Sequence, residues 1–518
     1  GVVRALQFKP KEAEAEFKAA LAKDPGSVFT KVQLARVLLS QREFAAALPL
    51  YKEAAEREPG NIDSADGYIR TLVATGNMAQ ALEAVKAANT RFPDNARIAY
   101  LFGRIDDARG EGASAEAHYT KAVAADPALV EARLYLARSQ LRTKQVDKAR
   151  EQLQLAHQAS PDSALVHTGL GELALATGEG PRAREAFERA VALNPNLADA
   201  HLGLSREALA AGELPRARTE VDRALELDPR LKDARLHRGL VHWRQGALAE
   251  AITELEAAKA EDPRAVAIPV MLGTVRLQSG DLAGAESNLL LALRAEPSHA
   301  EALYQLALVK ARRAEYTQAL ESMRSAVDRA PKRADFRYAF GVILRDAKRL
   351  GEAMEEWKTA VSLDPGSADA HEALGQAYLE RGDLEAAVDA FQASLKVDPK
   401  RTRVIGAIGD AYFNAARWGE AVAQYQTALR QDPSLTPLLY KVGRAYSEQS
   451  DHAKAVEWYR KAIGSDSQNP MPFYYLGFAY KEKGRKKEAI SAFKEYLSRR
   501  PDAEDKKDIE EEIYDLEH

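Results

Sequence analysis

The sequence predicts an all-α solenoid, in which pairs of helices repeat along a chain of 518 residues. Three observations predict it. Proline recurs every 34 residues from Pro25 to Pro433, without insertion or deletion, and the register resumes at Pro501. When each such proline is called position 32, position 20 is alanine in every repeat, and position 24 is always large and apolar. A fixed period of this length indicates a stack of identical supersecondary units.

Each repeat is expected to contain two antiparallel helices. Small residues at positions 8, 20 and 27 let the helix axes approach closely, while the bulky residue at position 24 fills the space beside them. Glycine at position 15, as in Gly76 and Gly178, ends the first helix in a left-handed conformation. Proline at position 32 stops the second helix, commonly behind an acidic residue, as in Asp24-Pro25.

The two ends of the chain differ from the full repeats. Counting backwards, Gly1 is a position 8 and Phe17 a position 24, so the chain is predicted to start inside a repeat and to be a fragment of a longer protein. Near the C-terminus, Ile509, Ile513 and Leu516 share one helical face in a segment that is otherwise mostly charged, as in a solenoid cap. The predicted organisation is therefore a truncated repeat (1–27), eleven repeats (28–401), three last repeats that form a separable binding unit (402–503) and a capping helix (504–518).

This pattern resembles the tetratricopeptide repeat, whose signature is a 34-residue helix-turn-helix with small residues at positions 8 and 20 and proline at 32. The resemblance covers nearly the whole chain. It implies a right-handed superhelical solenoid with fourteen full repeats, a truncated N-terminal repeat and a C-terminal capping helix. The chain departs from the family at position 4, where the frequent aromatic residue is replaced by polar or varied residues such as Lys31, Arg133 and His201.

The composition disfavours several classes of protein. Lys and Arg number 73 against 77 Asp and Glu, so no general basic field is available to hold nucleic acid. The absence of cysteine excludes disulfides, thiolate zinc sites and cysteine nucleophiles. No apolar run approaches the ~18 residues of a membrane span, so we expect no direct membrane insertion of this chain. The expected compartment is the cytoplasm, with the periplasm left open.

No catalytic or metal site is predicted. The letters G-x-G-x-x-[GA] occur at 169–174, but inside a predicted first helix with no strand before it. His237 and His242 are five residues apart, which turns them to different faces of a helix. Acidic runs such as 510–512 are typical of a solvated helix surface. We therefore predict a protein that is not an enzyme and holds no cofactor.

The groove offers the first candidate site. At ~100° per residue, positions 4, 7, 8 and 11 of the first helix point into the helix pair, and positions 2, 5, 9 and 13 point away. The resemblance implies that this outward side lines the concave surface. Two interpretations stay open for the arginines at position 9: recognition of an acidic peptide or chain terminus, and local pairing, as of Arg70 with Asp66 or Asp63. These arginines, here called the basic rail, are Arg36, Arg70, Arg104, Arg138 and Arg206.

A second candidate site lies in the last two repeats, where outward positions carry aromatic residues, Met and Arg. This composition is typical of a protein-binding hot spot. The alternative is packing against the capping helix. The residues are Tyr440, Arg444, Met471, Tyr474, Tyr475 and Phe478.

The sequence thus favours a non-catalytic scaffold or adaptor that binds proteins or peptides in its concave groove. Arginine and alanine are abundant, which is typical of GC-rich bacterial genomes. Long bacterial arrays of the resembling family include adaptors that localise envelope machines such as type IV pili, some in response to Ras-like GTPases, so a small GTPase is one expected partner. Two alternatives stay open: the repeat region of a glycosyltransferase-like enzyme without its catalytic domain, and an envelope lipoprotein scaffold.

Overall fold

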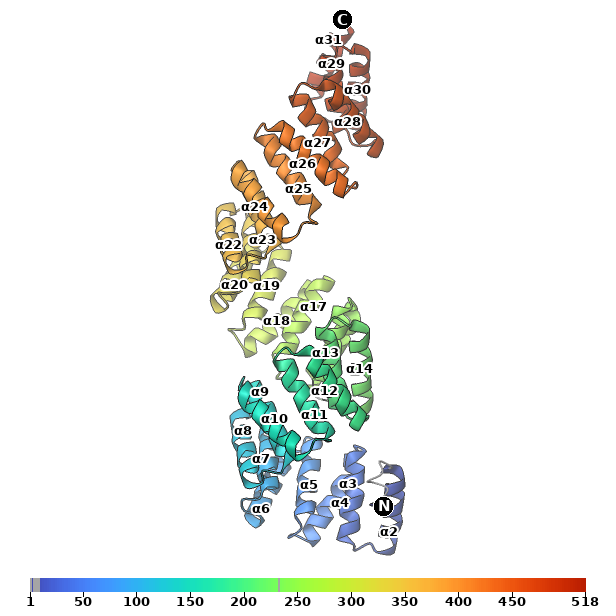
Figure 1. The fold of residues 1–518 in the computed structure, drawn as a ribbon, viewed down its shortest axis with the longest axis vertical. Helices are drawn as coiled ribbons and strands as arrows, with labels where there is room; N and C mark the ends of the chain where they lie inside the picture. Colours follow the sequence, from blue (N-terminus) through green and yellow to red (C-terminus); the bar gives the residue numbers. More distant parts are fainter. Residues whose placement is uncertain (1, 3–9, 232) are drawn as a thin grey trace. The chain divides into compact units, whose positions relative to one another are not determined.

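The computed structural model describes residues 2, 10–231 and 233–518, and these residues form helices and short turns with no strand among them (Figure 1). This confirms the predicted all-α solenoid. The chain divides into two compact units, 1–262 and 263–518, which are described separately. The prediction that Gly1 is a position 8 lies outside the described residues.

The first unit is built from successive helix pairs, in which the two helices of a pair make the most extensive contacts and each pair packs on the next. Its helices are α2 (Pro10–Lys23), α3 (Val28–Ser40), α4 (Phe44–Arg57), α5 (Ile62–Ala74), α6 (Met78–Arg91), α7 (Ala96–Arg109), α8 (Gly112–Ala125), α9 (Val130–Arg142), α10 (Val146–Ala159), α11 (Ala164–Ala176), α12 (Gly180–Leu193), α13 (Ala198–Ala210), α14 (Leu214–Leu227), α15 (Ala234–Arg244) and α16 (Leu248–Glu261).

The second unit repeats the same arrangement and ends with one further helix, α31, which packs on α30. Ile509 and Ile513 of α31 are buried in the core of the last repeat, and Leu516 packs against it. Its helices are α17 (Ala267–Ser279), α18 (Leu282–Ala295), α19 (Ala300–Arg312), α20 (Tyr316–Arg329), α21 (Ala334–Asp346), α22 (Leu350–Leu363), α23 (Ala368–Arg381), α24 (Leu384–Val397), α25 (Thr402–Asn414), α26 (Trp418–Gln431), α27 (Pro437–Glu448), α28 (His452–Ser465), α29 (Met471–Glu482), α30 (Lys486–Arg499) and α31 (Lys506–Glu517).

The small residue at position 8 is required by the large residue at position 24 of the same repeat. A Cβ atom placed on Gly103 would lie 2.5 Å from a ring carbon of Tyr119, and one on Gly443 would lie 2.5 Å from a ring carbon of Tyr459. The ring therefore lies directly against the backbone of the first helix. Alanine at position 20 is fully buried throughout, as at Ala217, and completes the close approach of the two helices.

The turn between the helices of a repeat is left-handed at position 15 whether or not glycine occupies it. Gly76 and Gly280 have φ of 79° and 86°, and Ala314 has φ of 58°. Since a Cβ atom is crowded in this conformation, the non-glycine turns carry strain. The non-glycine residues with positive φ at position 15 are Arg42, Lys144, Ala314, Lys348, Ala416 and Ser450.

Replacing Ala314 with glycine is expected to stabilise the α19–α20 pair by up to about 1 kcal/mol, because the left-handed strain that it removes exceeds the conformational entropy that glycine adds to the unfolded chain. The reverse change, Gly280→Ala, should destabilise the α17–α18 pair by a similar amount, since open space surrounds Gly280 and only the backbone strain changes. Amide hydrogen exchange of the flanking helices measures both effects. Shifts of the same sign in the two variants would contradict this account of the turn.

An ion pair in the first unit joins two repeats that are far apart in the sequence. An Arg42 guanidinium nitrogen lies 2.6 Å from Asp228 Oδ2, although Arg42 follows α3 and Asp228 follows α14. Asp228 is buried, whereas the equivalent Asp364 is exposed. The first and sixth full repeats of the predicted frame therefore touch.

Candidate functional site: the outward face of the first helices

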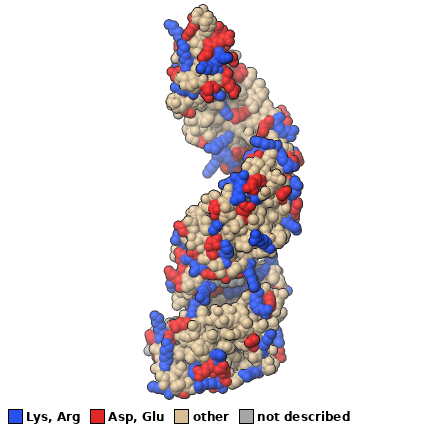
Figure 2. Space-filling model, turned by 180° about the vertical axis from the view of Figure 1, so that it is seen from behind, with Lys and Arg blue, Asp and Glu red and all other residues tan. Residues whose placement is uncertain are grey.

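The first helices of neighbouring repeats contact one another directly. Examples are the contacts of α5 with α7 and of α27 with α29. Side chains at positions 5, 6 and 9 of successive first helices consequently meet on one face of each unit. Acidic and basic side chains are interspersed over the surface seen in Figure 2.

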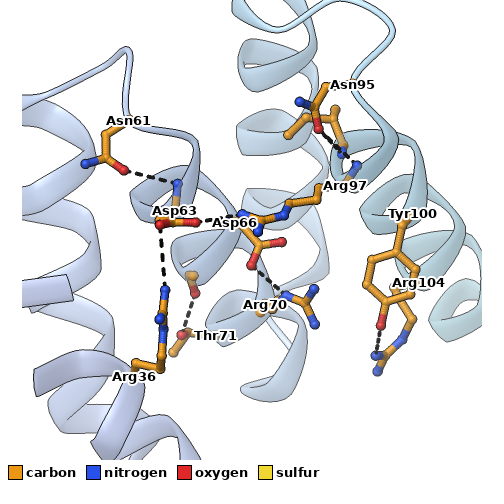
Figure 3. Close-up of polar contacts among 12 residues, drawn as sticks. Arg36, Asn61, Asp63, Asp66, Arg70, Thr71, Asn95, Arg97, Tyr100 and Arg104 are labelled. Carbon is orange, nitrogen blue, oxygen red and sulfur yellow. Dashed lines mark hydrogen bonds and ion pairs between the residues drawn. The ribbon is translucent and has the colours of Figure 1, made fainter. Parts of the chain in front are cut away.

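The basic rail in the first unit is largely paired with carboxylates (Figure 3). Arg70 Nε donates to Asp66 Oδ2 at 2.7 Å. An Arg36 guanidinium nitrogen lies 3.7 Å from Asp63, which also accepts a hydrogen bond from Arg97 at 2.6 Å. Local pairing, one of the two interpretations left open by the sequence, thus describes these two arginines.

Arg138 is paired with an acid at its own register position in the next repeat. Its guanidinium donates two hydrogen bonds of 2.8 Å to the carboxylate of Glu172, with Asp199 at 3.6 Å. Glu172 occupies position 9 of the fifth repeat, where the row of arginines is interrupted. That interruption is the sequence signal for this pair, and sequence reasoning missed it.

Tyrosine rings alternate with the middle arginines of the rail. The guanidinium carbon of Arg104 lies 4.3 Å from the ring centroid of Tyr135, and that of Arg70 lies 5.0 Å from the centroid of Tyr100. Burial raises the pKa of Tyr135, which keeps the ring neutral beside the arginines. Sequence reasoning did not single out these tyrosines, which sit at positions 5 and 6.

Two arginines of the rail have no carboxylate partner within the described part of the chain. Arg104 donates one hydrogen bond, to the Tyr100 hydroxyl at 3.0 Å, and is half-buried. Arg206 on α13 is exposed and makes no hydrogen bond or ion pair with a described residue. The five arginines are therefore not equivalent.

In the second unit, Arg444 is held between two aromatic rings. Its guanidinium carbon lies 4.7 Å from the ring centroid of Phe413 and 4.8 Å from that of Tyr475. Tyr440 stacks on Tyr475 with centroids 6.2 Å apart and an interplanar angle of 10°. Arg444 forms no hydrogen bond or ion pair with the described residues, and its guanidinium nitrogens are not buried. Phe413, at position 12 of α25, is a member of this stack that the sequence did not reveal.

Tyr474 and Phe478 turn toward the end of the unit. The Tyr474 ring packs edge-on against Tyr496 at 5.1 Å, and the Phe478 ring packs edge-on against Phe493 at 5.0 Å. Burial raises the pKa of Tyr474, and the carboxylates Asp505, Asp508 and Glu512 raise it further. These two rings thus pack against the last repeat and the segment that follows it.

Alanine at both Tyr474 and Phe478 is expected to destabilise the last repeat by about 2 kcal/mol or more, because the rings cover the buried Tyr496 and Phe493. The readout is faster amide exchange in α29 to α31. Tyr440→Ala serves as the control, since its ring stacks on Tyr475 without contacting Tyr496 or Phe493. Equal exchange in the double variant and the parent would show that the two rings do not support the core.

Met471 begins α29 and is half-buried. The structure therefore brings Tyr440, Arg444 and Tyr475 together, and it places Tyr474 and Phe478 toward the terminal core. Whether any of these residues binds a partner stays a prediction.

A cavity of about 260 Å³ opens beside Arg444, among α23, α25, α26 and α27. Lys441 Nζ lies 2.8 Å from both carboxylate oxygens of Asp410, and the Tyr425 hydroxyl donates to Asp410 Oδ1 at 2.7 Å. Asp410 is thereby satisfied by its neighbours. Asn414, which also lines the cavity, makes no side-chain hydrogen bond to a described residue.

A larger cavity of about 630 Å³ lies among α14, α15 and α16. Position 7 of this repeat holds Arg238, whereas the other full repeats carry Leu, Ile, Val, Phe or Tyr there. Arg238 donates to Glu254 at 2.7 Å and lies 3.4 Å from Asp222. Ion pairs thus replace apolar packing at position 7 of this repeat.

Nowhere in the described ranges do three or more His, Cys, Asp or Glu side chains gather in a way that could hold a metal ion. Of the helices that the structure describes, none has the length and apolar character needed to cross a bilayer.

Solved structures with a similar fold include the anaphase-promoting complex hetero-tetramer Cut9–Hcn1 (16% identity, 99% of this chain and 94% of that chain, TM-score 0.36) and MamA (25% identity, 32% and 92%, TM-score 0.31). A third is the C-terminal part of a repeat protein from Cytophaga hutchinsonii (16% identity, 46% and 98%, TM-score 0.41). A search of curated proteins found no match.

Family models give the assignment. Tetratricopeptide repeat models match residues 38–105, 108–173, 155–198, 168–229, 202–266, 270–334, 368–401, 407–470 and 473–503, and a TPR repeat model matches 341–380. Together they cover most of the sequence, in agreement with the 34-residue period and the helix pairs. The chain belongs to the tetratricopeptide repeat family.

Proposed function

We propose that this chain is a protein-interaction scaffold whose principal partner-binding surface lies on α25, α27 and α29. We call this surface the aromatic face. The observation that supports the proposal is the Arg444 guanidinium, stacked between two rings and without a carboxylate partner among the described residues. The aromatic face consists of Phe413, Tyr440, Arg444, Met471 and Tyr475.

Its energetics suit recognition. Interface hot spots are enriched in Tyr and Arg, because these side chains bury a large area at a low entropic cost. The stacking of Arg444 removes much of its rotational freedom before any partner arrives, so less ordering is needed on binding. All five side chains of the aromatic face are half-buried, which leaves part of each available for contact.

The experiment is affinity purification with the full chain and with the double variant Tyr440→Ala, Arg444→Ala. A partner bound at the aromatic face should be lost from the double variant while helicity, measured by circular dichroism, is kept. Arg430→Ala on α26 is the matched control, since Arg430 is exposed and contacts no residue of the aromatic face. Retention of every partner by the double variant would refute the assignment.

The first partner candidates are Ras-like GTPases and components of type IV pilus machines, since long bacterial arrays of this family include adaptors that localise such machines, some in response to Ras-like GTPases. A purified GTPase in its GTP and GDP states can be tested directly against the aromatic face. The alternatives, a repeat region from a glycosyltransferase-like enzyme and an envelope lipoprotein scaffold, are both compatible with partner binding at the aromatic face.

A second binding surface is proposed around Arg104. Its guanidinium lies between Tyr100 and Tyr135 and keeps donors that no described carboxylate satisfies, unlike Arg70 and Arg138. An acidic peptide bound there should lose affinity as salt rises and in Arg104→Glu. A partner whose affinity ignores both changes binds elsewhere.

A further inference from the structure

A groove of about 610 Å³ lies on the second unit between the second helices α26 and α28. Leu429 of α26, Leu439 of α27 and Trp458 of α28 give it an apolar lining, and all three side chains are half-buried. The aromatic face is made by first helices alone, whereas this groove is bordered mainly by second helices. We call it the outer groove, and it is a separate surface with room for a side chain of a second protein.

The last repeat fills the equivalent space with its own side chains. Leu439 is at position 4 of its repeat, and Phe473 is at position 4 of the next. Phe473 is buried, and the guanidinium carbon of Arg499 lies 4.1 Å from its ring centroid. At position 30, where the last repeat has Arg499, the preceding repeat has Ser465. The smaller side chains of Leu439 and Ser465 therefore leave open the space that a ring and a guanidinium group occupy one repeat later.

A carbonyl group beside the outer groove lacks a donor. In other repeats the carbonyl at position 32 accepts a hydrogen bond from the following repeat. Arg133 Nε donates to the Pro127 carbonyl at 2.7 Å, and Arg499 Nε donates to the Ser467 carbonyl at 2.7 Å. Pro433 is at position 32 and lines the outer groove, but its carbonyl accepts no hydrogen bond from a described residue. A ring that fills the groove can satisfy this carbonyl if it carries an O–H or N–H donor, as Tyr and Trp do.

The charge at the groove favours an acidic segment. Lys461 is exposed, and its Nζ lies 4.3 Å from the ring centroid of Trp458. Lys461 has no carboxylate partner within the ranges that the structure describes. The residues that line the groove include no Asp or Glu. A segment with negative charge therefore complements the groove, whereas a basic segment is repelled.

We propose that the outer groove receives a Tyr or Trp side chain of a partner protein, on a segment with acidic residues beside that ring. The ring packs on Leu439 and Trp458, in the space equivalent to that of Phe473. Its O–H or N–H group donates to the Pro433 carbonyl, and a neighbouring acid pairs with Lys461. Rings inserted between apolar walls with one polar contact are typical of interface hot spots. This inference goes beyond the proposed function, since it concerns a second surface with its own occupant.

The test compares the parent chain with a variant that fills the outer groove itself. Leu439→Phe combined with Ser465→Arg copies the ring and the guanidinium group of the last repeat, so this filled variant should keep its helicity in circular dichroism. Random heptapeptides displayed on phage are selected on the parent and depleted on the filled variant. The recovered peptides should share a Tyr or Trp with Asp or Glu close to it. If the filled variant loses helicity, Trp458→Ala takes its place in the depletion.

Synthetic copies of the recovered peptides test each contact. Replacing the Tyr or Trp by Ala should weaken binding about tenfold or more, since truncating a hot-spot ring costs at least that much. Replacement by Phe should weaken binding less, because the ring is kept and only the donor is lost. Lys461→Glu should weaken binding of the acidic peptides. The matched control is Lys487→Glu on α30, since Lys487 is exposed and forms no ion pair or hydrogen bond with a described residue.

Three results would overturn the proposal: no peptide that prefers the parent to the filled variant, equal binding of the Tyr or Trp peptides and their Ala copies, or equal effects of Lys461→Glu and Lys487→Glu. Peptides that are lost in Tyr440→Ala but bind Lys461→Glu as they bind the parent would also count against it, because they occupy the aromatic face. The proposed function and this inference can therefore fail independently of each other.

Discussion

Replacing Trp357 with alanine is expected to destabilise its repeat by about 3 to 5 kcal/mol, the usual range for removing a large buried aromatic side chain. Trp357 on α22 is 1% exposed, lies against the backbone of Gly341, and donates from Nε1 to the Tyr338 carbonyl at 3.1 Å. The substitution therefore removes apolar packing and leaves a carbonyl group without its donor. Amide exchange in α21 and α22 should accelerate accordingly.

The matched control is Trp458→Ala. Trp458 on α28 is only half-buried and borders an open cavity, so truncating it should cost about 1 kcal/mol or less. Since each repeat contacts mainly its neighbours, the exchange of distant helices such as α3 should stay unchanged in both variants. Equal effects at the two tryptophans would contradict the role of position 24 as the central packing position.

Acidification should loosen the sixth and seventh repeats through His237. The pKa of this histidine is lowered from 6.5 to about 4, mainly by burial and also by the charge of Arg206, while the hydrogen bond with Ser205 acts in the opposite direction. His237 Nε2 donates to Ser205 Oγ at 2.9 Å, and the Ser205 hydroxyl donates to the Ala217 carbonyl. The folded state thus favours neutral His237, whereas the unfolded chain accepts a proton below pH 6.5.

Neutral His237 contributes to the free energy of unfolding. This contribution is fully present above about pH 6.5 and is lost as the pH falls toward 4. At about 1.4 kcal/mol for each tenfold difference in proton affinity, the loss amounts to about 3 kcal/mol. His237→Gln keeps a hydrogen-bond donor but does not titrate, so its α13 and α15 should lose less protection between pH 7 and pH 4. His371→Gln on α23 is the control. Identical pH dependence in His237→Gln and the parent would refute this assignment.

The sequence predicted the repeat because a few contacts recur in every unit. Ala217 shows the rule at position 20, and Gly103 with Tyr119 shows it for positions 8 and 24. The left-handed turn at position 15 could be predicted only where glycine occupies it, yet Ala314 adopts the same turn as Gly280. Tertiary packing of the two helices overrides the local preference of the residue there.

The candidate sites were predictable only in part, because side-chain partners depend on geometry between repeats. The sequence showed the row of arginines. The pairing of Arg138 with Glu172 could not be predicted, because it depends on position 9 of adjacent repeats lying side by side. Phe413 could not be found from outward positions, because it reaches Arg444 from position 12 of the preceding repeat. Likewise, the outward positions of Tyr474 and Phe478 did not reveal their contacts with Tyr496 and Phe493.

The ion pair between Arg42 and Asp228 changes how the first unit should respond to tension. A stack of helix pairs stretches like springs connected in series, so every repeat shares a pulling force and extends in turn. The ion pair between the first and sixth repeats acts in parallel with the repeats that lie between them, so it resists their extension until it breaks. Because Arg42 is partly exposed, dissolved salt weakens the attraction between Arg42 and Asp228. Pulling on the unit at low ionic strength should therefore meet a stiff initial response, and at high ionic strength the same unit should extend softly from the start.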